Sequence, residues 1–208
     1  RHGEIMNRYD PEHEIGLIVD EWGCWYDVEK GTNPGFLYQQ NTMRDAIVAA
    51  CNLNIFNRHS ERVIMANLAQ AVNALLLTEG EKLVKTPTYH VFDMFKEHQD
   101  GENVYCFCEN VMTGEIPMMS VSASVKDGVM TVTAANCSLE ESAELDCDIS
   151  GFECSSVSAR ILTDEVHSFN SFDAPEKVAP EALSASVSNG KLSAVLPACS
   201  VAVFTILY

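Results

Sequence analysis

The hydrophobic positions of the chain follow two different periods, and the change falls near residue 100. Before that point, short continuous apolar runs alternate with stretches whose apolar residues recur every three or four positions. After it, apolar and polar residues alternate one by one over several short segments. The first pattern is typical of alternating β-strands and α-helices, and the second of antiparallel β-structure. We therefore expect an α/β domain over residues 1–98 and an all-β domain over residues 99–208.

The first strand and helix of the α/β half are predicted within residues 15–58. The run Leu17–Val19 is apolar at every position, which is typical of a parallel strand covered on both faces. Turn-forming residues at 30–35 then predict a loop. The next segment carries a helical apolar stripe that should face a sheet, formed by Ala46, Ala49, Ala50, Leu53 and Phe56.

A second strand and helix follow in the same order. Residues 63–68 form another short apolar run, and residues 69–73 would then lie at the same sheet edge as Glu21. Thr86 and Pro87 predict the start of a helix, because the hydroxyl can accept from a free N–H and proline has no N–H to leave unpaired. The apolar side of that helix would be formed by Tyr89, Phe92 and Phe95.

The pattern of the second half predicts an antiparallel β-sandwich. Residues 99–103 are predicted to form a hinge between the two halves. Residues 119–125 alternate between apolar residues and serine, and residues 129–134 form the next such run. Asp127–Gly128 between them predicts a hairpin with a type I′ turn, in which both central residues need a positive φ. Further alternating runs lie at 145–149, 157–163, 191–196 and 201–207.

The chain is strongly acidic, with 13 Lys and Arg against 30 Asp and Glu among 208 residues and a net charge of −17. Nucleic acids and anionic membranes select for clustered basic residues, so we expect neither as a partner. The sequence shows no basic-plus-apolar leader and no apolar run near the roughly eighteen residues of a membrane span. We therefore expect a cytoplasmic protein, for which an uncharged polysaccharide fragment is a compatible ligand.

The eight cysteines and six histidines are scattered along the chain. Cys106 and Cys108 would share one face of a strand, but no paired spacing typical of a zinc site occurs. A chain with this many core residues does not need disulfides for stability. We expect reduced, mostly buried thiols, no metal and no organic cofactor. His59 and His90 are interpreted as hydrogen-bonding residues.

The strongest candidate for chemistry is the end of the first predicted strand, where Asp20 and Glu21 precede Trp22 and Trp25. In a parallel barrel, catalytic residues lie at the C-terminal ends of the strands. Indole rings beside a carboxylate suit a sugar-binding cleft, because the C–H face of a sugar stacks on an aromatic ring. The alternative is an ordinary strand that ends in a solvated Asp-Glu pair.

A series of motifs, in order, resembles one enzyme family over nearly the whole chain. The segments are 20–22, 43–50, 53–56, 58–59, 62–63, 66–73, 86–92, 169–175 and 196–201. Together they resemble an α-L-arabinofuranosidase of glycoside hydrolase family 51. The resemblance implies a (β/α)8 barrel followed by a C-terminal β-sandwich, and it covers only the last two βα units of that barrel. The family's proteins are considerably longer on the N-terminal side.

The same resemblance implies that Glu21 is the nucleophile of a retaining glycosidase. Asp20 would face away from Glu21 in an extended strand and so could not be the partner acid. The family's acid/base is a glutamate in a Gly-Asn-Glu motif, which this sequence lacks. Trp25 would form a wall of the sugar subsite, and Gln70 would hydrogen-bond the sugar hydroxyls. Trp22 could equally be a packing residue, and we interpret Asn73 and Arg62 as structural.

Three functions follow as expectations. The first is release of terminal arabinofuranosyl groups from arabinose-containing oligosaccharides by the parent enzyme, a homo-oligomer, with this chain inactive on its own. The second is a non-catalytic carbohydrate-binding or interaction module, which an aromatic platform on an exposed strand would favour. The third is an endo-acting β-glucanase of the same fold. The second half contains no tryptophan, and most of its aromatic residues fit a core; these residues are Tyr105, Phe107, Phe152, Phe169, Phe172, Phe204 and Tyr208.

Overall fold

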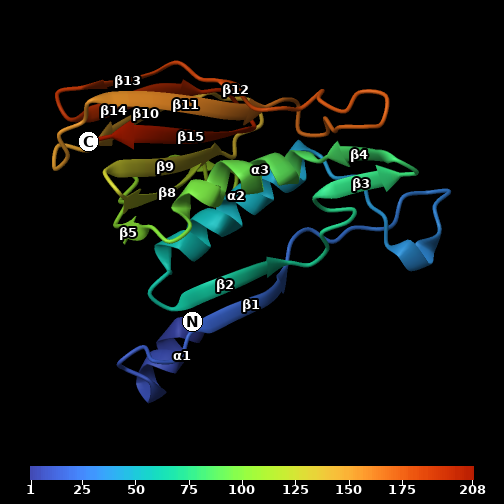
Figure 1. The fold of residues 1–208 in the computed structure, drawn as a ribbon, viewed down its shortest axis with the longest axis horizontal. Helices are drawn as coiled ribbons and strands as arrows, with labels where there is room; N and C mark the ends of the chain where they lie inside the picture. Colours follow the sequence, from blue (N-terminus) through green and yellow to red (C-terminus); the bar gives the residue numbers. More distant parts are fainter.

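The computed structural model describes residues 1–208 and contains three parts (Figure 1). At one end, helix α1 (His2–Tyr9) lies beside two parallel strands, β1 (Leu17–Trp22) and β2 (Val63–Leu68). Helices α2 (Met43–Arg58) and α3 (Pro87–Phe95) form a middle layer. Antiparallel sheets form the other end of the molecule.

The predicted order of strand, helix, strand and helix is confirmed by β1, α2, β2 and α3, with β1 and β2 parallel. Other elements of this half were not expected. They are α1, the short helices η1 (Pro34–Phe36) and η2 (Lys96–His98), and a hairpin between β2 and α3 formed by β3 (Leu76–Glu79) and β4 (Lys82–Lys85). Gly80, with a φ of 58°, forms the turn of that hairpin.

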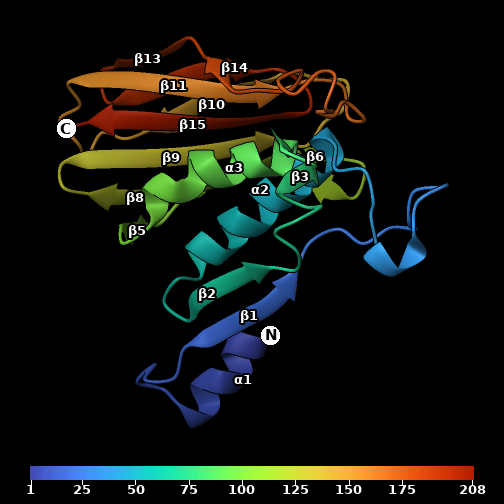
Figure 2. The ribbon, with the colours of Figure 1, turned by 45° about the vertical axis from the view of Figure 1, so that its right-hand side comes forward.

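One face of the β1–β2 pair is open, which contradicts the expectation of a strand covered on both sides. Ile18 is 46% exposed and Ile64 is 66% exposed, although both are large apolar residues. The physical reason is that α2 and α3 lie to one side of the pair, between it and the antiparallel sheets (Figure 2). The apolar residues of the other side have no layer of this chain above them.

Both long helices begin with the caps that the sequence favours. The main-chain N–H of Thr42 donates to Asp45 Oδ2 at 2.9 Å, and the two residues form a capping box at the start of α2. Thr86 Oγ1 accepts from the N–H of Tyr89 at 3.2 Å, as predicted for α3. The buried side of α3 differs from the prediction, because Tyr89 and Phe92 are only half-buried. Its buried apolar residues are Val91, Met94 and Phe95.

The larger antiparallel sheet has six strands in the order β12-β11-β15-β9-β8-β5. The predicted hairpin is confirmed, since Asp127 and Gly128 have φ values of 49° and 79°. The first strand, β5, begins inside the segment predicted as a hinge. The strand bounds are β5 Glu102–Val104, β8 Met119–Lys126, β9 Val129–Asn136, β11 Ser156–Thr163, β12 Glu181–Ala182 and β15 Ser200–Leu207.

The smaller sheet has three antiparallel strands, β10 (Ala143–Asp148), β14 (Lys191–Leu196) and β13 (Ala185–Ser188). It shares an apolar core with one face of the larger sheet, including Leu192 and Leu196 from the smaller sheet and Val132, Phe204 and Ile206 from the larger. The strand β13 was not expected. Its turn, Asn189–Gly190, has positive φ at both residues and is the same kind of hairpin signal as Asp127–Gly128. A minor hairpin joins β6 (Met112–Thr113) and β7 (Ile116–Pro117).

The opposite face of the larger sheet packs on the helices through polar as well as apolar contacts. Ser122 Oγ and Thr133 Oγ1 both donate to Asn54 Oδ1 on α2, at 2.8 and 2.7 Å. These three side chains are completely buried. His98 completes the contact, with Nδ1 2.7 Å from Ser124 Oγ and Nε2 2.9 Å from Thr133 Oγ1. The serines that alternate along β8 are thus covered by a helix layer.

Several side chains differ from their expected surroundings. All eight cysteines are free, but only Cys137 and Cys199 are buried and the other six are half-buried. His90 Nε2 is buried without a hydrogen-bond partner, so the interpretation of His90 as a hydrogen-bonding residue is wrong for that atom, whereas His59 Nδ1 lies 3.5 Å from Glu61 Oε1. Tyr105 and Phe107 are 85% and 76% exposed and do not belong to a core.

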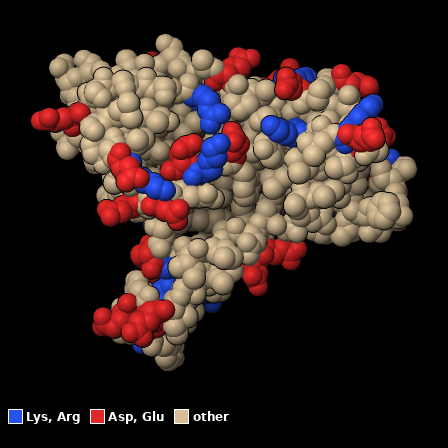
Figure 3. All heavy atoms as spheres, in the orientation of Figure 1, with Lys and Arg blue, Asp and Glu red and all other residues tan.

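Charged side chains of both signs share the face seen in Figure 3. There the Lys and Arg side chains lie singly or among Asp and Glu, and none forms a continuous basic surface. No helix has the length and apolar character needed to cross a membrane. No three His, Cys, Asp or Glu side chains are grouped in a way that could hold a metal ion.

Candidate active site

Glu21 lies at the C-terminal end of β1, where the strand is bulged. Val19 pairs with Ala66, but the next pair is Trp22 with Leu68, so Asp20 and Glu21 together oppose a single residue of β2. Such a bulge bends a strand and re-aims its side chains. The strict alternation assumed for Asp20 and Glu21 therefore does not hold across this point, and both carboxylates are exposed.

Trp22 is a packing residue. Its ring stacks on Phe92 of α3 and meets the edge of Phe56 of α2, with centroid distances of 5.8 and 5.4 Å. The chain turns sharply straight after it, at Gly23, whose φ of 133° is rarely adopted by residues with a side chain. Of the two interpretations of Trp22, the structure favours packing, and the indole that remains open to solvent is that of Trp25.

The structure brings Glu21, Trp25 and Gln70 to the same end of the parallel pair. Glu21 and Trp25 line an open hollow of about 380 Å³, together with Ala69, which directly follows β2. Trp25 is 62% exposed there. Gln70 and Trp25 both line a second, narrow cavity of about 40 Å³, which has room for water molecules rather than a sugar ring.

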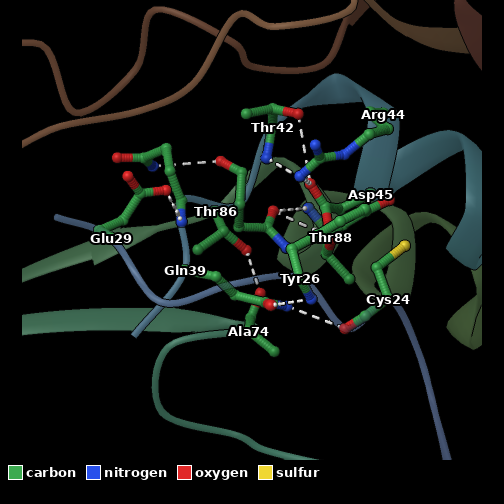
Figure 4. Close-up of polar contacts among 12 residues, drawn as sticks. Cys24, Tyr26, Glu29, Gln39, Thr42, Arg44, Asp45, Ala74, Thr86 and Thr88 are labelled. Carbon is green, nitrogen blue, oxygen red and sulfur yellow. Dashed lines mark hydrogen bonds and ion pairs between the residues drawn. The ribbon is translucent and has the colours of Figure 1, made fainter. Parts of the chain in front are cut away.

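Side chains from the loop that follows β1 and from the start of α2 make polar contacts beside this region (Figure 4). Gln39 hydrogen-bonds the main chain on both sides of Trp25, at Cys24 and Tyr26. The Arg44 guanidinium lies 3.6 Å from the centre of the Tyr26 ring. Gln39, Asn41 and Arg44 were not predicted as part of the site. The signal available in the sequence was the polar run Gln39–Asn41 directly before the helix cap.

Two ionisable groups of this loop, Cys24 and Tyr26, have pKa values shifted toward their neutral forms. Burial, followed by a contact with the Cys24 thiol, raises the pKa of Tyr26 to about 12. Burial also raises the pKa of Cys24, and the nearby Asp45 carboxylate adds to this effect. Because a thiolate is the nucleophilic form of cysteine, Cys24 is a poor nucleophile here. Glu21 carries the only carboxyl group among the residues that line the open hollow.

Arg62 and Asn73 have the structural roles expected of them. Arg62 is 3% exposed and donates to Asp10, to Asn7 Oδ1 and to the carbonyl of Ile15 at 2.8 Å. It thus fastens the segment that precedes β1. Asn73 has a φ of 80° and donates from Nδ2 to the carbonyl of Phe36 at 3.2 Å. That bond ties the loop after β2 to the loop after β1.

Comparison with known proteins identifies the family of this chain. Residues 20–200, which begin at the carboxylate pair, match the family model of the α-L-arabinofuranosidase C-terminal domain. The chain belongs to this family. It is 38% identical, over 97% of its length, to an intracellular exo-α-L-arabinofuranosidase of Bacteroides ovatus, and it covers 41% of that protein.

Solved structures of arabinofuranosidases agree with this assignment. The glycoside hydrolase family 51 arabinofuranosidase of Xanthomonas axonopodis pv. citri superimposes with a TM-score of 0.93 at 40% identity, covering 99% of this chain and 44% of that one. The family 51 enzyme AbfB of Bifidobacterium longum gives a TM-score of 0.83 over 99% of this chain and 46% of its own, but at 21% identity it supports the fold alone. The resemblance to family 51 seen in the sequence is confirmed. The chain spans about two fifths of the length of these arabinofuranosidase relatives.

Proposed function

We propose that the chain is the C-terminal part of a retaining α-L-arabinofuranosidase in which Glu21 is the nucleophile. The observation that carries this proposal is the convergence of Glu21, Trp25 and Gln70 at one end of β1 and β2, in a chain of this family. A carboxylate, an open indole and a side-chain amide are the groups that cleavage and recognition of a furanoside need.

The same proposal assigns the two halves of the chain. Residues 1–98 are the last two βα units of a (β/α)8 barrel, and residues 99–208 are a C-terminal antiparallel β-sandwich. The parallel pair β1–β2 with its helices on one side supports the first assignment, because the exposed Ile18 and Ile64 lie on the face that a barrel would fill. The apolar layer shared by the two antiparallel sheets supports the second.

The chemistry requires a second carboxyl group from the rest of the enzyme. Glu21 attacks the anomeric carbon and forms a glycosyl ester, while an acid/base about 5 to 5.5 Å away protonates the departing oxygen. Water, deprotonated by that same acid/base, then cleaves the ester with overall retention. Trp25 would hold the apolar face of the arabinofuranosyl ring. Gln70 is half-buried, and its amide has no hydrogen-bond partner within the chain, so it is free to bond a sugar hydroxyl.

The substrates proposed are arabinan and arabinoxylan oligosaccharides, from which the parent enzyme releases terminal arabinofuranosyl groups in the breakdown of hemicellulose. The exo-acting relatives favour this activity over endo-cleavage of a β-glucan. Because two of these relatives are named intracellular enzymes, we place the parent enzyme in the cytoplasm. It would work on short fragments that have already entered the cell.

The test of this function is Glu21→Gln in the full-length polypeptide, with Asp20→Asn as the matched control. An amide cannot form the glycosyl ester, so Glu21→Gln should abolish turnover of 4-nitrophenyl α-L-arabinofuranoside. Asp20→Asn should retain most of it. If Glu21→Gln keeps more than a small percentage of the wild-type rate, the nucleophile lies elsewhere.

A second candidate, a carbohydrate-binding module, is favoured by one observation. Tyr105 and Phe107 are exposed and lie two positions apart, beside an apolar hollow lined also by Phe152. Stacking on two such rings would give the all-β half an affinity for arabinan without catalysis. Calorimetric titration with arabino-oligosaccharides tests it. Binding that is lost in Tyr105→Ala and Phe107→Ala, but kept in Glu21→Gln, would support the module.

A further inference from the structure

The segment after β1 has few main-chain contacts of its own. Between Trp22, whose carbonyl accepts from Ala69 N at 3.2 Å, and Glu29, whose N–H donates to the Tyr38 carbonyl at 2.8 Å, no main-chain to main-chain hydrogen bond is formed. Trp25 lies in the middle of this stretch and is 62% exposed. Its position must therefore be fixed by side chains.

One side chain meets this need. Gln39 Nε2 donates to the Cys24 carbonyl at 2.8 Å, and Gln39 Oε1 accepts from the Tyr26 N–H at 2.6 Å. The two bonds flank Trp25 on either side in sequence, and both appear as dashed lines in Figure 4. They are the only hydrogen bonds that main-chain groups make between Gly23 and Val28. A neutral amide is required, because one group must donate while the other accepts.

The residues that follow Gln39 are fixed by hydrogen bonds to other segments. The next residue but one, Asn41, is buried and exchanges hydrogen bonds with Thr88 at the start of α3, including Nδ2 to Oγ1 at 2.8 Å. The Gln40 N–H donates to Glu29 Oε1 at 2.9 Å. On the far side, Arg44 packs over the Tyr26 ring. The main chain beside Trp25 is thus connected to the first turn of α3 through Gln39 and the nearby Asn41, and to the first turn of α2 through Tyr26 and Arg44.

We propose that Gln39 is a positioning residue that holds the Trp25 indole at the Glu21 hollow by bonding the main chain on both sides of it. This inference rests on the proposed function, since it assumes that Trp25 meets the substrate. Gln39 lines the narrow cavity beside the hollow, not the hollow that holds Glu21. It acts on the substrate through Trp25.

The experiment compares Gln39→Met and Gln39→Glu with Gln40→Met in the full-length polypeptide. Gln40 is a suitable control because it is also half-buried, and its side chain bonds only to Tyr38 and Asn41. Two readouts are needed: hydrogen exchange of the peptide covering residues 23–28, and separate kcat and KM values for 4-nitrophenyl α-L-arabinofuranoside. The melting temperature of each variant reports whether it is folded.

Gln39→Met should speed exchange in residues 23–28 and lower kcat/KM about tenfold, as expected for lost orientation of one subsite wall, mostly through a higher KM. Gln39→Glu should show the same loss near pH 7 and regain part of it in acid, because only the protonated carboxyl can donate to the Cys24 carbonyl. Gln40→Met should match the wild type in both readouts.

Unchanged kcat/KM in a folded Gln39→Met variant overturns the proposal, as does an equal loss in Gln40→Met. Failure of the proposed function is seen separately, as an inactive wild type or an active Glu21→Gln. In that case the hydrogen-exchange data still test whether Gln39 holds the main chain beside Trp25. Faster exchange confined to Gln39 variants supports the role of Gln39 in holding Trp25, and unchanged exchange overturns it.

Discussion

The indole of Trp22 stacks on the ring of Phe92 with their centroids 5.8 Å apart and their planes inclined by 13°. Phe56 meets the same indole edge-on, at an interplanar angle of 75°. Trp22 directly follows Glu21 in the sequence. The end of β1 that carries the carboxylate is therefore held by aromatic contacts to α2 and α3.

Trp22→Ala should lower the free energy of unfolding by about 3 kcal/mol, because truncating a large packed aromatic leaves a cavity and loses its ring contacts. Trp25→Ala should change it by less than about 1 kcal/mol, since that indole is 62% exposed. Urea unfolding followed by circular dichroism measures both. Equal losses in the two variants would mean that Trp22 has no special packing role.

The 208-residue chain on its own should show no significant turnover of an aryl α-L-arabinofuranoside. The proposed acid/base is not part of it, and proton transfer by a positioned group is worth roughly 10² to 10⁴ in rate. Loss of the other subsite walls also removes the orientation that makes Glu21 effective. A purified chain that approaches the rate of the full-length enzyme would refute this prediction.

The isolated chain should also self-associate. Ile18 and Ile64 expose an apolar face on β1 and β2, and the outer edges of the two strands carry unpaired main-chain groups. Light scattering across a range of concentrations measures the mass. A clean monomer in which both strands keep their parallel pairing would contradict the prediction, whereas Ile64→Lys should reduce association by placing a charge on that face.

His98 should make stability depend on pH in the acidic range. Its burial lowers its pKa to about 4, below the value of about 6.5 expected in the unfolded chain. The unfolded chain therefore binds the extra proton between these values, so the stabilisation is complete above about pH 6.5 and is lost as the pH falls toward 4. The loss should amount to about 3 kcal/mol at most, and His98→Gln should flatten this part of the profile measured by urea unfolding.

Local signals predicted most of the regular structure. The Thr86 cap, the Asp127–Gly128 turn and the strands of the β half all depend on neighbouring residues, and the main strands end within two residues of their predicted bounds. Family motifs placed Glu21, Trp25 and Gln70, and the structure brings these three residues to one edge. The turn at Gly80 and the Asn189–Gly190 turn after β13 also contain glycine with a positive φ.

Contacts between distant segments could not be predicted in the same way. Ser122 belongs to an alternating strand whose polar side would normally face water, yet it is buried by Asn54, which lies 68 positions earlier. Gln39 is one of several polar residues in a loop, and only the return of that loop to Cys24 and Tyr26 distinguishes it. The bulge at Asp20 and Glu21 depends on the partner strand, and the sequence of β1 alone contains no sign of it.

The contact between Asn54 and Thr133 has a consequence for how such proteins can be recombined. A change of pattern near residue 100 suggests that the β half could be exchanged between enzymes by a cut at that point. Such a cut would take the buried Asn54 side chain from one enzyme and the residues at positions 122 and 133, whose hydroxyls donate to it here, from the other. A crossover placed before Met43 would inherit α2, α3 and the larger sheet together. The segment that can be exchanged between enzymes without breaking this contact therefore begins before Met43 and is longer than the all-β half.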